Sequence, residues 1–468
     1  MLFPTAAFAV FFVGAFLANW LTRPRPRLWQ ATMIGFSFYF YGFWNPRYVM
    51  LLGASIVGNH LVARWIAADG RQGRAPLVIG VAGNLLVLGF FKYFGFFATE
   101  VTNTLGSLGL DVVAPVVHVV LPVGISFFTF QALSYLIDLH RGDLTGPMTL
   151  PELAFYLSFF PQLVAGPIVR ATDMVDQIRR RPDPRTIPAG EGFLLITRGL
   201  AKKVVISSYL ATNVVDPVFA VPSDHSRLEV LAAVYGYAIQ IYADFSGYTD
   251  IAIGCALLLG FRFPANFDAP YRSLSVTEFW RRWHISLSTW LRDYLYIPIG
   301  GSRGSAARTA RNLMVTMVLG GLWHGASWTF VGWGALHGSA LVVERTAARY
   351  WRPVGAPAPL VTAARWLVTM NVICAAWVFF RAESFSRAFE IFGRLASAPI
   401  DPVVPGLVVV AITGAVMAQF VPVSTGQRLR AGFVRISPLA QVGVLAAALT
   451  VIDAFGPAGV APFIYFQF

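Results

Sequence analysis

The sequence predicts an all-helical protein that crosses a membrane many times. Of its 468 residues, 56% are hydrophobic and only 13% are charged, and the mean hydropathy is +0.62. Soluble domains carry about a quarter charged residues, so this composition argues strongly against a soluble globule. Long apolar runs also alternate with short loops that carry arginine, which is typical of a polytopic membrane protein.

The apolar runs set the expected number of spans. The first run is not expected to be a signal peptide, because no basic residue precedes it. At about 20 residues per crossing, the runs predict about ten to twelve transmembrane helices. They cover residues 2–21, 30–45, 48–68, 76–98, 119–139, 190–212, 228–260, 311–344, 358–380, 403–422 and 437–454.

The basic residues predict the orientation of the chain. The net charge of +13 comes from residues that stand singly or in threes between apolar runs, so we interpret them as topology determinants in a lipid bilayer rather than a nucleic-acid surface. Arg23, Arg25 and Arg27 follow the first run, which places the N-terminus outside. The expected outer loops lack lysine and arginine and cover residues 101–140, 211–226 and 395–427. Arg381, Arg387 and Arg394 do not fit this alternation of basic inner loops with outer loops that lack basic residues.

Two segments are unusual for spanning helices. Residues 152–169 are short and broken by Pro161 and Pro167, and residues 271–298 are apolar but carry several charges. Irregular backbone at membrane depth is tolerated only when it is buried in protein or faces a water-filled cavity. We therefore expect re-entrant or interfacial segments around an internal cavity. Without an internal repeat or a long linker, the chain is expected to form one integral-membrane domain over residues 1–468.

The run 311–344 contains the strongest candidate for catalysis. If it is helical from Arg311, His324 lies roughly 20 Å from that charged end at 1.5 Å per residue, near the middle of the bilayer. Ionisable residues in a membrane are expensive and mark functional sites. A neutral histidine is a suitable general base for a hydroxyl, and the small neighbours Gly325, Ala326 and Ser327 would let a substrate approach. With no H-E-x-x-H motif and no histidine pair at i,i+4, no metal site is expected.

The segment 279–296 is expected to form a helix. Trp280, Trp283, Leu287 and Trp290 would then share one face, while Arg292 and its charged neighbours need water. The simpler interpretation is an interfacial amphipathic helix with aromatic anchors. The helix would also place His284 and Ser288, four residues apart, along one side of a site.

The segment 235–254 carries a polar stripe. Tyr237, Gln240, Asp244 and Tyr248 lie within about 80° of one another on a helix and are expected to face inward. Asp244 could stabilise the cavity through hydrogen bonds or hold the tautomer of a catalytic ring, and we favour the structural role.

These segments resemble the membrane-bound O-acyltransferase (MBOAT) family, and in particular its alginate O-acetyltransferase branch. The strings WRRWHISLSTWLRDYLYIPIGG at 280–301 and GLWHGASWTFVGWGALHG at 321–338 carry the resemblance. Shorter matches are PQLVAGPIVR at 161–170, DFSGYTDIAIG at 244–254, ANFDAPYRS at 265–273 and WVFFRAES at 377–384.

The resemblance implies helices wrapped around an intramembrane tunnel, with His324 as the catalytic histidine and His284 as the second characteristic histidine. His337 matches a position that we treat as structural. The residues expected to line the tunnel are Trp323, Ser327, Ser288, Asp244, Gln240, Tyr248, Trp280 and Arg292.

The resemblance also implies the substrates and partners. A cytosolic acyl thioester, acetyl-coenzyme A or an acyl carrier protein, would donate the acyl group, and no permanently bound cofactor is expected. The family picture is of a bacterial inner-membrane subunit that passes acetyl groups to exported envelope acetyltransferases, which then modify the polysaccharide.

Other functions stay open from the sequence. Acetylation of peptidoglycan or cellulose, or D-alanyl transfer to teichoic acid, would use the same two histidines. A small-molecule transporter could use the buried polar residues as a path, but such folds usually contain internal repeats and none is detected.

Overall fold

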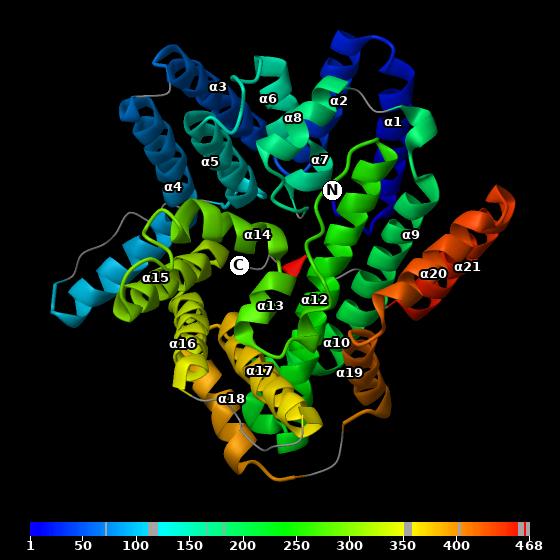
Figure 1. Cartoon of the computed structure of the whole chain (residues 1–468). Coiled ribbons are helices and arrows are strands. Elements are labelled where there is room, and N and C mark those ends of the chain that lie inside the picture. Colours follow the sequence, from blue (N-terminus) through cyan, green and yellow to red (C-terminus); the bar gives the residue numbers. More distant parts are fainter. Residues whose placement is uncertain are drawn as a thin grey trace. The chain divides into compact units, whose positions relative to one another are not determined.

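The computed structural model describes residues 1–70, 73–110, 120–164, 166–180, 183–350, 358–400, 404–456 and 463–464, without the side chains of residues 349 and 350. Its regular elements are helices, drawn in Figure 1 from α1 in blue to α21 in red, and the described residues contain no strand. Parts of five predicted segments lie outside the described residues. They are residues 111–119 of the stretch 101–140, residue 119 of the run 119–139, residue 165 of 152–169, residues 401–403 of 395–427, and residue 403 of the run 403–422.

The chain divides into two units that are interleaved in the sequence. Unit 1 comprises Met1–Gly192 and Ala252–Pro264, and unit 2 comprises Phe193–Ile251 and Ala265–Phe468. The chain passes from one unit to the other within the helices α9 (Ala189–Leu200) and α12 (Arg227–Leu258). The expectation of a single domain stays a prediction.

Unit 1 is built around aromatic side chains. The Trp29 indole is fully buried, donates to Asn19 Oδ1 over 2.8 Å and packs on the rings of Phe155 and Phe261. The helices of this unit are α1 (Ala6–Thr22), α2 (Pro26–Gly42), α3 (Arg47–Ala68), α4 (Arg74–Ser107), α5 (Ile125–Arg141), α6 (Leu150–Ser158), α7 (Phe160–Leu163), α8 (Ala171–Arg180) and the 3₁₀ turn η1 (Pro184–Thr186).

The predicted irregular segment 152–169 is broken in the structure. Helix α6 ends at Ser158, and α7 is a single turn that begins at Phe160. A capping box starts α6, because the Thr149 hydroxyl accepts from the Glu152 backbone N–H and the Glu152 carboxylate accepts from the Thr149 N–H. Phe159 and Phe160 at the break are fully buried in unit 1.

Unit 2 carries the candidate histidines. Its elements are the remainder of α9 and α12, then η2 (Ala201–Ser207), α10 (Ser208–Leu210), η3 (Ala211–Val215), α11 (Asp216–Ala220), η4 (Pro222–Asp224), η5 (Pro270–Arg272), α13 (Val276–Arg282), α14 (Ile285–Leu291), η6 (Arg292–Tyr296), α15 (Ala306–His324), α16 (Trp328–Tyr350), α17 (Ala358–Arg381), α18 (Phe385–Ser397), α19 (Gly406–Ala418), α20 (Val423–Arg435) and α21 (Pro438–Phe455). The segments η2, η3 and η6 are π-helical, a geometry that is frequent at functional sites.

Helices α15 and α16 form a tightly packed pair. A Cβ atom added to Gly321 would collide with the carbonyl oxygen of Phe330, and one added to Gly334 would collide with the carbonyl oxygen of Met317. Small residues let helix backbones approach closely, as they do in membrane helix pairs. The two glycines therefore set the spacing of the helices that carry His324 and His337.

Two of the segments are interrupted at a histidine. The run 311–344 is helical from Arg311 to His324, as the placement of His324 assumed, and then breaks, because α15 ends at His324 and α16 begins at Trp328. The helix expected over 279–296 is divided because His284 adopts a left-handed conformation with φ of +42° between α13 and α14. Helical periodicity does not reveal a break that tertiary packing imposes.

Each predicted apolar run overlaps at least one helix, but fewer of these helices are both long and apolar enough to cross a membrane alone. Among the described residues, α3, α4, α17 and α21 are long and apolar enough to cross a membrane. The pair α19 and α20 qualifies as a fifth if its 94° bend is counted within one span. The protein is therefore a helical membrane protein, and the number of ten to twelve spans stays a prediction.

The arginines that did not fit the predicted alternation are paired in unit 2. Arg381 forms an ion pair of 2.9 Å with Asp216, Arg394 donates to the backbone oxygen of His225, and Arg387 pairs with Glu390. The backbone N–H of Arg227 donates to the Pro399 oxygen over 2.9 Å. These contacts bring the lysine- and arginine-free stretches 211–226 and 395–400 together.

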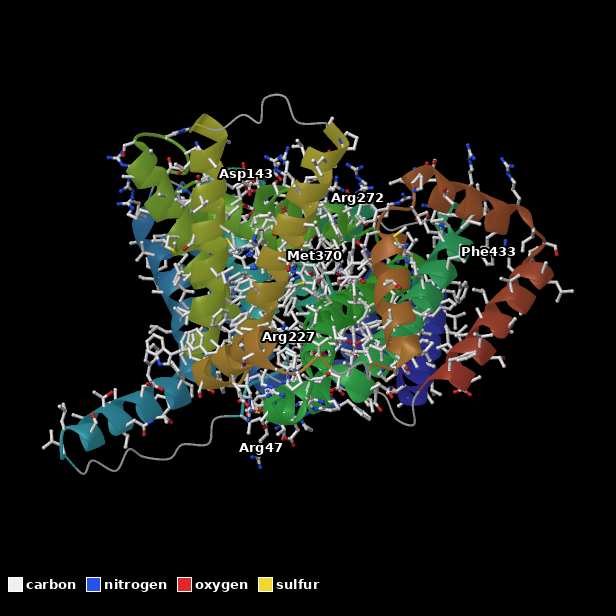
Figure 2. All side chains as sticks on the ribbon, turned by 90° about the horizontal axis from the view of Figure 1, so that it is seen from below. Arg47, Asp143, Arg227, Arg272, Met370 and Phe433 are labelled. Atoms are coloured by element: carbon white, nitrogen blue, oxygen red, sulfur yellow. The ribbon has the colours of Figure 1, made fainter. Side chains whose placement is uncertain are left out.

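Figure 2 places this junction within unit 2. The labelled Arg227 lies toward one end of the unit and Arg272 toward the other, with Met370 of α17 between them. The two stretches predicted to be outside therefore share one end of unit 2.

Candidate active site

Three buried histidines lie in one aromatic cluster of unit 2. The Trp323 ring centroid is 6.1 Å from that of His284 and 5.0 Å from that of His324. The Trp333 centroid is 5.0 Å from His324 and 4.8 Å from His337. Trp323 and Trp333 thus connect the three imidazoles. We call these five residues the histidine cluster.

His324 is the last residue of α15. The chain turns at Gly325, whose backbone is extended and whose missing side chain leaves room for the Phe330 ring. The imidazole is 5% exposed, and a further aromatic neighbour is Phe380, with ring centroids 5.1 Å apart. Because the break follows His324 directly, the ring lies at the end of a helix rather than along its side.

His284 lies at the break between α13 and α14. Its side chain is fully buried, its Nδ1 is 3.2 Å from Asn266 Oδ1, and its ring packs edge-on against Phe245 at 4.6 Å. Its Nε2 is buried and has no hydrogen-bond partner among the described residues. The left-handed backbone turns this ring toward Trp323 and away from the face that a continuous helix would give it.

His337, on α16, is also fully buried. The indole N–H of Trp280 donates to His337 Nδ1 over 3.3 Å, and the Phe279 ring stacks nearly parallel to the imidazole, 6.2 Å away. This residue connects α13 to α16, and the structural role expected for it stays a prediction.

The surroundings of the cluster are almost entirely aromatic. Trp283 and Trp377 are fully buried, with centroids 5.0 Å apart, and Trp377 lies 5.2 Å from Phe380. Burial in such surroundings disfavours a charged imidazole. A neutral histidine in a dry pocket is a competent general base, and hydrolysis of a reactive acyl group is suppressed there.

A cavity of 520 Å³ adjoins this cluster. Of the predicted tunnel residues, Trp280, Ser288 and Arg292 line it, and Trp280 also contacts Trp333 at 5.6 Å. Arginines from three elements line the same cavity: Arg281 of α13, Arg292 of η6 and Arg345 of α16. The cavity is therefore lined by three arginines and by Trp280, which contacts His337 and Trp333 of the histidine cluster.

The polar stripe of α12 has a different environment. Tyr237, Gln240, Asp244 and Tyr248 are all buried. Asp244 forms an ion pair of 2.5 Å with Lys203 of η2, and its other oxygen accepts from the backbone N–H of Ile464 over 2.8 Å. Both carboxylate oxygens are thus engaged away from the histidine rings. The next residue along α12, Phe245, is the one that contacts the His284 ring.

The last predicted lining residues are Trp323 and Ser327. Trp323 is 4% exposed and belongs to the histidine cluster itself. Ser327 lies in the turn after His324, where its hydroxyl is 3.0 Å from that of Thr329. Within the described ranges, no group of three histidine, cysteine or acidic side chains is arranged to hold a metal ion.

The fold and the site define a helical membrane protein with a buried, aromatic histidine centre. The chain matches the model of the membrane-bound O-acyltransferase family, MBOAT, over residues 116–382, which is more than half of its length. It therefore belongs to this family and is an O-acyltransferase.

Three named relatives show which members of the family the chain resembles. The chain is 40% identical to the probable alginate O-acetylase of Azotobacter vinelandii over 400 residues, covering 85% of this chain and 78% of that protein. It is also 40% identical to the protein of the same name from Pseudomonas aeruginosa over 402 residues, covering 85% and 75% of the two chains. It is 37% identical to the peptidoglycan O-acetyltransferase of Helicobacter pylori over 422 residues, covering 83% and 78%.

Some residues of the site were not predicted from the sequence. Asn266 and Lys203 are far in sequence from the segments that they support, and Trp333 and Phe380 look like ordinary apolar positions. Asn266 does lie in one of the strings that carry the family resemblance, ANFDAPYRS, which is a usable signal. Lys203 is one of only three lysines, and it lies in an apolar run, where a buried cation requires a partner.

Proposed function

We propose that this protein transfers an acetyl group from a cytosolic thioester to a hydroxyl acceptor, for the O-acetylation of an exported polysaccharide of the alginate type. The observation that carries the proposal is His324 at a helix end inside a buried aromatic cluster, in a chain that belongs to an acyltransferase family. Relatives named as alginate O-acetylases at 40% identity support the choice of polymer.

In the proposed mechanism, His324 is the general base. Its neutral imidazole takes the proton of the acceptor hydroxyl while the oxygen attacks the thioester carbonyl, and the thiolate leaves as the acyl group is transferred. Positioning both reactants in a narrow, water-poor tunnel lowers the entropic cost of the reaction and limits hydrolysis. His284, on the far side of Trp323, contacts the substrates from the opposite wall.

The 520 Å³ cavity is the proposed entrance for the acyl donor. Arginine is well suited to phosphate, because its planar guanidinium forms paired hydrogen bonds. Arg281, Arg292 and Arg345 would therefore hold the phosphates of acetyl-coenzyme A, while the pantetheine arm extends past Trp280 toward His324. The same arginines would face an acidic acyl carrier protein if that were the donor.

The proposed orientation places this entrance in the cytosol. The stretches 211–226 and 395–400 meet at one end of unit 2, and they carry no lysine or arginine. The positive-inside rule assigns such stretches to the outer side. We propose a bacterial inner-membrane protein with ten to twelve spans, in which shorter and broken helices complete those long enough to cross alone.

The acceptor side is proposed to work with partners. We infer that exported acetyltransferases of the envelope receive the acetyl group and modify the polymer, so that the polysaccharide is reached indirectly. Acetylation of peptidoglycan is the second candidate, supported by the 37% identity to a protein of that name.

The donor assignment is tested by comparing two thioesters. Acetyl-pantetheine has the reactive end of acetyl-coenzyme A but lacks its nucleotide phosphates. In purified protein, Arg281→Gln and Arg345→Gln should each raise the KM for acetyl-coenzyme A by roughly tenfold, as expected for loss of a charge-assisted hydrogen bond. The KM for acetyl-pantetheine should stay unchanged. An equal change with both donors would contradict the proposed phosphate site.

A further inference from the structure

The turn at His284 is held by one residue from a distant segment, Asn266. The backbone N–H of Ile285 donates to the Asn266 carbonyl oxygen over 2.9 Å, and Asn266 is 1% exposed. His284 has a φ of +42°, in the left-handed region that residues other than glycine seldom adopt. Such a conformation persists only where the surrounding contacts enforce it.

The side chain of Asn266 has a determined orientation. Its Oδ1 lies 3.1 Å from the backbone nitrogen of Ser286, 2.9 Å from the Ser286 hydroxyl and 3.2 Å from His284 Nδ1. A backbone N–H can only donate, so the atom facing it must be the oxygen of the amide. A flipped amide would place its own N–H groups against this backbone donor.

This orientation assigns the tautomer of His284. Because Asn266 Oδ1 is an acceptor, Nδ1 of the imidazole must carry the proton, and Nε2 therefore carries the lone pair. Nε2 is buried and has no partner among the described residues. Leaving a buried acceptor without a partner is costly, and a substrate donor would remove that cost.

We propose that Asn266 is a positioning residue that holds His284 as the Nδ1–H tautomer, so that Nε2 accepts a hydrogen bond from an O–H or N–H group of the substrate. The amide N–H groups of a pantetheine arm are such donors, whereas the reacting hydroxyl is not, because its one proton goes to His324. In this tautomer His284 cannot donate from Nε2 to the thioester carbonyl oxygen. Its role is therefore to align a substrate donor beside His324. This role deepens the proposed function and rests on it.

The tautomer itself can be measured without any activity. Solid-state NMR of protein labelled with ¹⁵N in its histidines separates protonated from unprotonated ring nitrogens, and His284→Gln identifies the signals of His284. The expected result is a protonated Nδ1 and an unprotonated Nε2. A protonated Nε2 in the wild-type protein would overturn the proposal, whatever reaction the protein catalyses.

Kinetics test the consequence with matched variants. Asn266→Asp keeps an oxygen at the same place, whereas Asn266→Leu has similar volume and no acceptor. Removing the second partner of an oriented histidine costs roughly 10- to 100-fold in metal sites, and we expect at least about a tenfold loss of kcat in Asn266→Leu. Asn266→Asp should restore most of the rate. Ser286→Ala removes a hydrogen bond to Asn266 without touching His284, and it should have a smaller effect.

Thermal unfolding of each variant in detergent controls for misfolding. A wild-type kcat in folded Asn266→Leu would overturn the proposal. Equal losses in the aspartate and leucine variants, at equal stability, would also overturn it. A wild-type protein with no acetyl transfer would contradict the proposed function alone, because the NMR result would still report the tautomer.

Discussion

Replacing Lys203 with methionine should be among the most destabilising single changes in unit 2. The side chains of Lys203 and Asp244 are only 1% and 2% exposed, and the Nζ–Oδ1 distance is 2.5 Å. Methionine fills much of the lysine volume but removes the cation, so that the carboxylate keeps the hydrogen bond from the Ile464 N–H without a neutralising charge. Removing one partner of a buried ion pair costs about 3–5 kcal/mol, because the remaining charge is buried and uncompensated.

A neighbouring lysine provides the control. Lys202 pairs with Asp250 over 2.8 Å, but Asp250 also accepts two hydrogen bonds from Arg198, at 2.6 and 2.8 Å. Lys202→Met therefore leaves the Asp250 carboxylate compensated, and we expect a loss of about 1 kcal/mol or less. The two substitutions are chemically identical and one residue apart.

Thermal unfolding in detergent, followed by tryptophan fluorescence, ranks these proteins. The double variant Lys203→Met with Asp244→Asn should recover much of the stability, since no buried charge is left and the amide oxygen still accepts from Ile464. Its acetyl-transfer rate per folded molecule should match that of the wild type if Asp244 is structural. Equal midpoints for Lys203→Met and Lys202→Met would refute the reasoning, and an inactive but stable double variant would give Asp244 a catalytic role.

The remaining predictions concern packing and pH. Gly334→Leu should force α15 and α16 apart at the Met317 carbonyl, so that acetyl transfer is lost together with several degrees of thermal stability; unchanged activity would show that the close packing is dispensable. Burial raises the pKa of Glu152, but hydrogen bonds from Arg179 and Thr149 outweigh it and hold the pKa below its ordinary value. The stabilisation is thus present above the unfolded-state pKa and lost as pH falls through the folded-state pKa. Because Arg179 is partly exposed, Glu152→Gln should cost under about 1 kcal/mol at neutral pH, and unfolding measured at decreasing pH should show the difference from wild type disappearing. A difference that grew in acid would contradict this account of the pair.

The sequence predicted the class of fold because its signals are local. Apolar runs, the arginine pattern and the cost of placing His324 in a membrane each depend on neighbouring residues. The broken segment 152–169 was predicted for the same reason, since Pro161 and Pro167 would each interrupt a helix that continued through them, and Pro161 instead lies in the first turn of α7.

The parts that escaped prediction depend on contacts between distant residues. A regular helix through residues 279–296 is the best local interpretation, but the pairing of Asn266 with the turn at His284 stabilises a left-handed residue there. The partner of Asp244 lies 41 positions earlier in the chain, on a π-helical segment that helical periodicity does not predict. The buried polar residues were therefore identifiable as important, whereas their partners required the structure.

The most direct test of the account is the rate of acetyl transfer by purified, reconstituted protein given labelled acetyl-coenzyme A, with His324→Ala and His284→Ala compared to wild type. General-base catalysis contributes roughly 10²- to 10⁴-fold, so His324→Ala should lose at least about a hundredfold in rate while remaining folded. His284→Ala should show a large but incomplete loss. Transfer by His324→Ala at the wild-type rate would contradict the assignment of His324 as the catalytic base.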